Sequence, residues 1–198
     1  MFLILISNLA YLYRKCVPKG HRLQPWVKIP SPSYLEKERR LKITIYGPYG
    51  DYEERLRNIA QRLRERYFFE DTYLVKDRPS HRPQNKDEDL DIFLTDKSYY
   101  YLRKSDVNLF IFYCGAYNSG VIVELKEVCD NIKWKLSCCA IFLDKNCNLG
   151  PLLNGQIKTS GILVDRFNGK AHNCDNLILQ FAFARCNVFL KTKFDSLS

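Results

Sequence analysis

The feature that most constrains the fold is a mostly apolar run at 107–113, which reads Val-Asn-Leu-Phe-Ile-Phe-Tyr. A run of this length without alternation is typical of a strand that is buried on both faces, as in a parallel sheet covered by helices. A loop of small and polar residues is predicted at 114–119, and a helix at 120–132. Ligands of open α/β sheets bind beyond the carboxyl ends of the strands, so a ligand site is expected at this loop.

Further strands and helices alternate along the chain from residue 41. The expected further strands are 41–46, 72–75, 136–143 and 161–164, and an added edge strand is considered at 188–190. The expected further helices are 52–67, 92–104 and 173–184. Long loops are expected at 76–91 and 144–159. This alternation favours a mostly parallel sheet with helices on both faces. Right-handed crossovers then favour the strand order 2-1-3-4-5. The predicted fold is a flavodoxin-like or Rossmann-like three-layer α/β sandwich with a five-stranded sheet.

The start of the helix at 52–67 carries its own signal. Asp51 is predicted to be the N-cap acceptor, and Glu54 follows three residues later, which makes an acidic version of the capping box.

Residues 1–40 differ from the rest of the chain in composition. They hold eight Lys or Arg residues against two Glu, and therefore six of the nine net positive charges. Four prolines between residues 16 and 40 predict an irregular linker. We therefore expect an N-terminal extension at 1–40 and a single α/β domain at 41–198. Because the domain itself is only weakly basic, we do not expect it to bind nucleic acid.

The first 13 residues are apolar and are followed by basic residues. This run is shorter than the ~20 residues that a membrane-spanning helix needs. Residues 1–22 are considered as a peripheral membrane contact, beside the alternatives of packing on the domain or on a second subunit.

The eight cysteines show no C-x-x-C spacing, and no histidine stands beside them at metal-ligand spacing. We expect free and mostly buried thiols, a cytoplasmic location, and neither a metal site nor a cofactor. A disulfide or zinc framework is the alternative. The sequence also lacks a Walker A motif, a G-x-G-x-x-G motif, an EF-hand loop and an H-E-x-x-H motif.

Glu124 is the candidate catalytic residue. It lies about one turn inside the helix predicted at 120–132, near the positive end of the helix dipole, where an ionised carboxylate is favoured. Such a carboxylate can act as a nucleophile or stabilise an oxocarbenium-like transition state at a sugar C1. The alternative is a surface residue paired with nearby lysines.

Two strand-end loops are predicted to bind the substrate. Tyr46 and Tyr49 are candidates to stack on a base or donate a hydroxyl, with core and rim packing as the alternative. Asn118 and Ser119 are candidates to cap the helix or to bind hydroxyls and phosphate through its free amides. The candidate set is Tyr46, Gly47, Pro48, Tyr49, Gly115, Asn118, Ser119 and Gly120.

Three short motifs resemble one known family. Ile43–Tyr49 looks like the first strand and Gly-Pro turn of nucleoside 2-deoxyribosyltransferases and their relatives. Ser105–Phe112 is similar to their pattern of a small residue, an aspartate and a hydrophobic strand. Asn118–Leu125 resembles the Gly-x-x-x-Glu-Leu helix start that carries the family's catalytic glutamate. TIR-type NAD-cleaving domains are more distant relatives with a similar sheet and a catalytic glutamate.

This resemblance covers roughly residues 41–145. It implies cleavage of an N-glycosidic bond in a nucleoside, nucleotide or NAD-type ligand, with Glu124 as nucleophile or stabiliser. It also implies a homo-oligomer, because such relatives often complete their site across a dimer. Ser98 stands where the family commonly has an aspartate, and Lys126 stands where a small residue is usual.

Two other functions stay open. One is a non-catalytic nucleotide-binding or signalling module with the same fold. The other is an interaction protein that residues 1–40 dock on a membrane or on a partner.

Overall fold

The computed structural model describes residues 41–131, 139–171 and 173–195. The expected extension at 1–40 and the first residues of the strand expected at 136–143 lie outside these ranges. In chain order the elements are β1 (Ile43–Tyr46), α3 (Glu53–Tyr67), β2 (Thr72–Leu74), the 3-10 turn η1 (Val75–Asp77), α4 (Leu90–Lys104), β3 (Val107–Phe112), α5 (Ser119–Asp130), β4 (Cys139–Asp144), α6 (Pro151–Ser160), β5 (Leu163–Phe167) and α7 (Cys174–Asp195).

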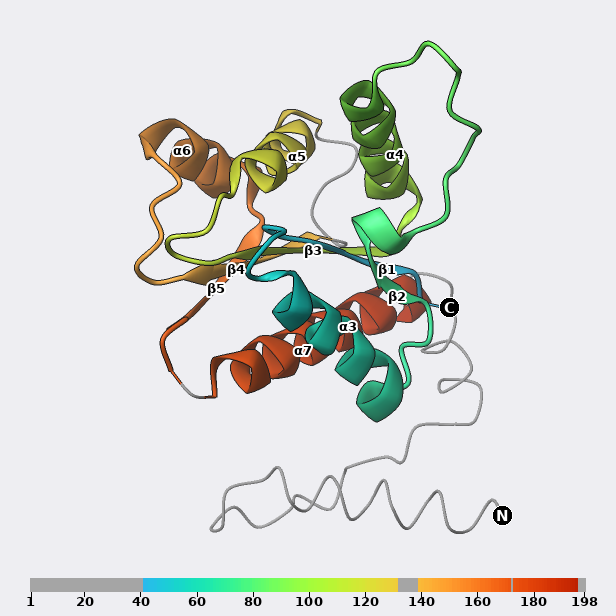
Figure 1. Cartoon of the computed structure of the whole chain (residues 1–198). Coiled ribbons are helices and arrows are strands. Elements are labelled where there is room, and N and C mark those ends of the chain that lie inside the picture. The colour runs from blue at the N-terminus through green and yellow to red at the C-terminus, as the bar shows by residue number, and fades with distance from the viewer. Residues whose placement is uncertain (1–40, 132–138, 172, 196–198) are drawn as a thin grey trace, which may run out of the picture. The chain divides into compact units, whose positions relative to one another are not determined.

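The five strands form one parallel sheet in the order β2-β1-β3-β4-β5, which confirms the predicted order. β1 lies between β2 and β3, so that Ile43 is in register with both Thr72 and Val107. Helices α4, α5 and α6 cover one face of the sheet, and α3 and α7 cover the other (Figure 1). The described part of the chain is therefore the predicted three-layer α/β sandwich.

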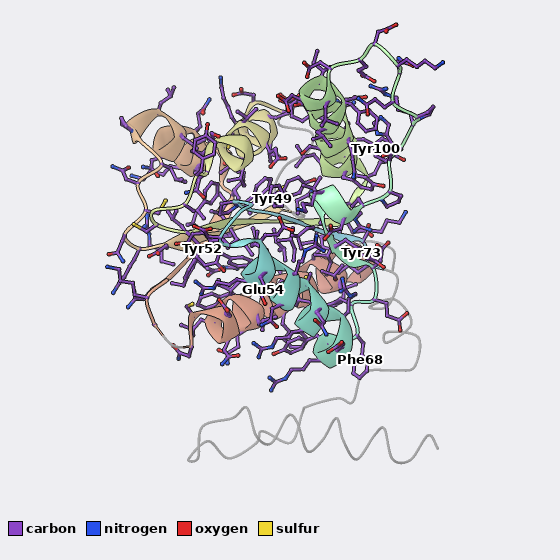
Figure 2. All side chains as sticks on the ribbon, in the orientation of Figure 1. Tyr49, Tyr52, Glu54, Phe68, Tyr73 and Tyr100 are labelled. Atoms are coloured by element: carbon purple, nitrogen blue, oxygen red, sulfur yellow. The ribbon has the colours of Figure 1, made fainter. Side chains whose placement is uncertain are left out.

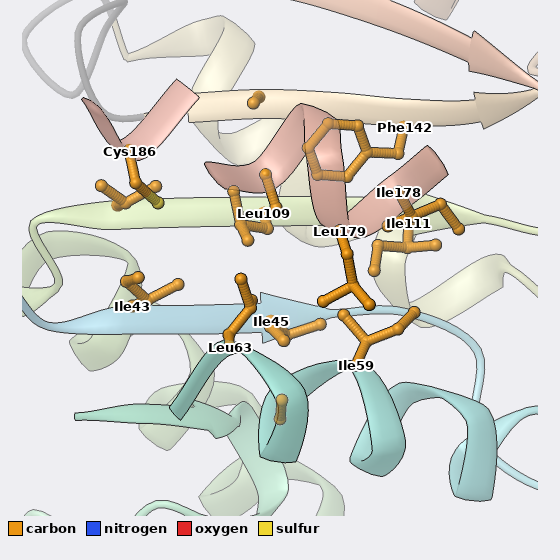
Figure 3. Packing of buried hydrophobic residues seen from close by; sticks show 14 of the residues in the cluster. Ile43, Ile45, Ile59, Leu63, Leu109, Ile111, Phe142, Ile178, Leu179 and Cys186 are labelled. Atoms are coloured by element: carbon orange, nitrogen blue, oxygen red, sulfur yellow. The ribbon is translucent and has the colours of Figure 1, made fainter. Parts of the chain in front are cut away.

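Side-chain alternation along the strands divides the core into two apolar clusters. The cluster under α3 and α7 includes Ile43, Ile45, Ile59, Leu63, Leu109, Ile111, Phe142, Ile178 and Leu179 (Figure 3). The cluster under α4, α5 and α6 includes Tyr46, Phe110, Phe112, Val121, Leu125, Val128, Ile141 and Leu143. Every residue of β3 is buried, including the polar Asn108, as the mostly apolar run without alternation predicts.

A buried arginine joins β1 to the start of β2. The guanidinium of Arg78 donates to the carbonyl of Ile43 over 2.7 Å and to the hydroxyl of Thr44 over 3.2 Å. It also forms an ion pair with Asp71, and only 7% of Arg78 is exposed. Nothing in the local sequence pattern predicted this clamp, because Arg78 and its partners come from three separate segments.

The amino ends of β1 and β3 are joined at the edge opposite the predicted site. The backbone amide of Lys42 donates to the Asp106 carboxylate over 3.0 Å, across 64 residues of sequence. Asp106 therefore has a structural contact at the start of β3.

The predicted capping box is wrong. The N-cap of α3 is Tyr52, and no side chain caps the helix there. Instead, Gly50 takes a positive φ of 79°, and its carbonyl accepts a 3.0 Å hydrogen bond from the amide of Glu53. A glycine adopts this backbone conformation without strain, so a backbone turn closes the helix start without the Asp51 carboxylate.

Two further expectations fail in the last third of the chain. The loop expected at 144–159 contains α6, which has Pro151 at its first turn and the left-handed Gly161 just after its end. The edge strand considered at 188–190 lies within α7. That helix continues past the predicted end at residue 184 because its buried side chains keep packing on the sheet as far as Leu190.

No helix within the described ranges combines the length and the apolar character that crossing a membrane requires. Of the cysteines described there, Cys139, Cys174 and Cys186 are buried, Cys129 and Cys147 are partly buried, and Cys114 is exposed.

Candidate functional site

The topology brings the two predicted loops to the same edge of the sheet. β1 and β3 are parallel neighbours, with Tyr46 in register with Phe110. After β1 the chain turns to α3 on one face, and after β3 it turns to α5 on the other face (Figure 1). Strand neighbours whose following helices diverge in this way make a topological switch point, where α/β proteins bind ligands.

Glu124 reaches this edge from α5 and contacts α4. Its Oε1 accepts a short hydrogen bond from the Ser98 hydroxyl. The Glu124 side chain is partly exposed by surface area, but enough protein surrounds it that burial raises the pKa of its carboxyl to about 7. The hydrogen bond from Ser98 acts in the opposite direction and is the weaker effect.

This electrostatic result corrects one step of the sequence reasoning. We expected the helix dipole to favour the ionised carboxylate, whereas loss of water around Glu124 acts in the opposite direction and raises the pKa of its carboxyl. In the parts of the chain described here, Glu124 forms no ion pair with a lysine, so the surface-pair alternative gains no support. The carboxyl is instead poised between its neutral and charged forms near neutral pH.

Tyr46 is part of the core. Its ring is fully buried and stacks on Phe110 with 4.9 Å between the ring centroids. Its hydroxyl donates to the carbonyl of Ser98 over 3.5 Å. Of the two roles kept open for this tyrosine, the structure supports packing, with the hydroxyl directed at Ser98, whose side chain bonds Glu124.

Tyr49 lies at the rim, where the chain leaves β1 (Figure 2). It is 39% exposed, and the ammonium of Lys76 lies 5.1 Å from its ring centroid. Burial, followed by the nearby Glu124 charge, raises the pKa of the Tyr49 hydroxyl. The same two causes raise the pKa of Tyr46, so both tyrosines are electrostatic neighbours of Glu124.

Gly47 and Pro48 are buried, and Gly47 lies against Leu56 of α3. A Cβ at Gly47 would lie 2.8 Å from Cδ1 of Leu56, which is closer than real Cβ contacts. The glycine therefore serves the close approach of this loop to α3, and neither residue presents much surface to a ligand.

The loop after β3 is folded by Asn118. Its Nδ2 donates to the carbonyls of Tyr113 and Ala116, each over 3.0 Å. Asn118 stands at the N-cap of α5, but its side chain does not cap the helix. Gly115 takes a positive φ of 81°, which suits a glycine at this turn.

The helix start beyond this loop is open to solvent. Ser119 and Gly120 are both exposed, and a Cβ at Gly120 would meet nothing within 4 Å. Tyr117, which sequence reasoning did not select, is 86% exposed beside them.

Asp144 is a second residue at this edge that sequence reasoning missed. It ends β4 and is only 3% exposed. Its Oδ2 accepts a 3.2 Å hydrogen bond from the amide of Cys114, and its Oδ1 accepts one of 3.1 Å from the amide of Asn146. An aspartate directly after a buried strand was the available signal, and its role here is to hold the loop after β3.

A polar cluster lies on the opposite face, between α3 and α7. The guanidinium of Arg55 lies 4.7 Å from the ring centroid of Tyr113, and Tyr52 stacks on the same ring at 4.6 Å. Arg55 also pairs with Asp175 over 2.6 Å. These contacts connect the two helices and do not include Glu124.

A shallow hollow on the surface of α4 is lined by Asp91, Ile92, Thr95, Asp96 and Tyr99. None of the predicted site residues lines it, although Tyr99 follows Ser98 in sequence. Among the described residues, no group of three His, Cys, Asp or Glu side chains is placed to hold a metal ion.

A scan against models of protein families, a search of curated proteins and a search of solved structures each returned no match.

Proposed function

We propose that this chain cleaves the N-glycosidic bond of a nucleoside, nucleotide or NAD-type ligand, with Glu124 as the nucleophile or the oxocarbenium stabiliser. The observation that carries the proposal is a carboxyl at the switch point whose burial raises its pKa to about 7. The short motifs that resemble nucleoside 2-deoxyribosyltransferases add support, because they place their catalytic glutamate at this position.

Burial of Glu124 suits this chemistry for an electrostatic reason. When the bond between C1 and the base nitrogen breaks, the base leaves with the bonding electron pair and the sugar gains positive charge. A carboxylate interacts with that charge more strongly in a poorly hydrated site than in water. The unfavourable burial in the free protein is therefore offset in the transition state, as differential binding requires.

Two outcomes of the bond cleavage are compatible with one carboxylate. Glu124 either stays ionised beside the sugar while water adds to C1, or attacks C1 to form a glycosyl ester. Water or a second base then breaks that ester and regenerates the carboxylate. Both routes need the ionised form, so base release is expected to rise with pH through about 7.

The test is a chromatographic screen for free base with NAD, nucleosides, deoxynucleosides and their monophosphates. We expect release by the native chain and a loss of about 1,000-fold in Glu124→Gln, a magnitude typical of removing one transition-state stabiliser. Glu127→Gln is the matched control, because Glu127 lies on the same helix and bonds the Asn131 side chain.

The results of this screen distinguish the glycosidic function from the non-catalytic nucleotide-binding module. Unchanged release by Glu124→Gln would exclude Glu124 as the reacting group. Ligand binding without release, in both the native chain and the variant, would support the non-catalytic nucleotide-binding module instead.

A further inference from the structure

Ser98 connects three elements around the Glu124 carboxyl. It lies on α4, it is 5% exposed, and its hydroxyl donates to Oε1 of Glu124 on α5. Its backbone carbonyl accepts the hydroxyl of Tyr46 from β1. A glutamate side chain has several rotatable bonds, so a fixed donor on a neighbouring helix restricts the positions that its carboxyl can take.

We propose that Ser98 is the positioning residue for Glu124, and that its hydroxyl holds Oε1 so that Oε2 is the oxygen presented to the substrate. This inference rests on the proposed glycosidic chemistry. In the described ranges, Oε2 accepts no hydrogen bond, whereas Oε1 has Ser98 as its donor. Ser98 therefore distinguishes two oxygens that are otherwise equivalent.

The groups that face Glu124 explain why the Ser98 hydroxyl affects the ionisation of the Glu124 carboxyl. Ser98 and Tyr99 approach from α4, Tyr46 from β1 and Tyr49 from the loop after it. Glu127, one turn further along α5, acts on Tyr99 in the same direction as Glu124 does.

Within the described residues, none of these groups is a cation. The Ser98 hydroxyl is the group that stabilises the charged form of the Glu124 carboxyl, because a donor to a carboxylate favours ionisation. Removing it leaves burial unopposed and moves the ionisation of Glu124 to higher pH.

The experiment compares the full native chain with Ser98→Ala and Ser98→Thr. The first readout is the titration of the Glu124 carboxyl by carbon NMR, assigned by the signal that disappears in Glu124→Gln. We expect the Ser98→Ala midpoint to rise by about one pH unit and the Ser98→Thr midpoint to stay near the native value. Ser160→Ala is the matched control, since Ser160 is equally buried and its hydroxyl bonds Ile157 instead.

The second readout is base release as a function of pH. We expect Ser98→Ala to lower kcat more than it changes KM and to shift the rising limb of the profile upward, with Ser98→Thr restoring both. If a folded Ser98→Ala chain keeps the native midpoint in both the NMR titration and the pH profile of base release, the positioning role is overturned. The glycosidic function would still stand. A moved NMR midpoint without base release by the native chain would overturn the glycosidic function and retain the contact as the control of Glu124 ionisation.

Discussion

Replacing Glu124 by glutamine is expected to change how the free energy of unfolding depends on pH. The variant keeps an oxygen that accepts the Ser98 hydroxyl but removes the ionisation. Because burial raises the pKa of this carboxyl in the folded state, the folded state holds the proton at a pH where the unfolded chain has released it. The contribution of Glu124 to stability is therefore complete below the unfolded pKa and is lost as the pH rises through the folded pKa.

The magnitude follows from the two pKa values. The carboxyl moves from an ordinary value of 4.5 to about 7 in the folded chain. At about 1.4 kcal/mol per pKa unit, the native chain loses roughly 3 kcal/mol over the whole interval, most of it between pH 5 and pH 8. Glu124→Gln is free of this loss, so its stability advantage over the native chain grows by that amount.

The assay is urea unfolding at several pH values from about 5 to 8, followed by far-UV circular dichroism. Glu54→Gln is the control, because Glu54 is an exposed carboxylate on α3. We expect the native and Glu54→Gln chains to lose stability in parallel, and Glu124→Gln to show the flatter dependence. Three parallel curves would refute the argument that burial controls the ionisation of Glu124, and with it the main support for the proposed chemistry.

Two further predictions concern the contacts that hold the sheet and the site loop. Arg78→Ala is expected to destabilise the chain by about 3 kcal/mol in urea unfolding, because it leaves the Asp71 carboxylate without its partner. Arg78→Lys is expected to recover only part of this loss. A loss of stability below about 1 kcal/mol in Arg78→Ala would contradict a clamp of this kind. Gly169→Ala is expected to lower the free energy of unfolding by about 2 kcal/mol, because the added Cβ would collide with Oδ2 of Asp144. The collision displaces the carboxylate that accepts the hydrogen bond from the Cys114 amide. A native melting temperature in this variant would show that the carboxylate moves without loss of stability.

Much of the fold could be predicted from the sequence because it depends on local patterns. The run at 107–113 lacks alternation, and the structure buries it on both faces. Strands and helices alternate along the chain, and the handedness of crossovers then leaves few sheet orders. The helix α6 was missed because Gly155 and its polar neighbours weaken the helical pattern, although Pro151 and Gly161 mark its two ends.

The contacts within the candidate site were less accessible to such reasoning. Ser98 and Glu124 lie on two helices, 26 residues apart in sequence, and their hydrogen bond depends on how α4 and α5 pack. The same limit applies to the pKa of Glu124, because the sequence shows the position of a carboxyl on a helix but not how much water surrounds it. Burial here raises the pKa of Glu124, in the direction opposite to the effect of a helix dipole.

The pairing of β1 with β3 has a consequence for how the chain folds. The hydrogen bond between Lys42 and Asp106 closes 64 residues of sequence, which include α3, β2 and α4. Closing so long a segment costs chain entropy before any contact compensates it, so this pairing is slow compared with the formation of the helices. An intermediate with formed helices but an unpaired β1 would hold the segment that carries Tyr46 and Tyr49 apart from Glu124. The candidate site edge is therefore complete only once β1 has paired with β3.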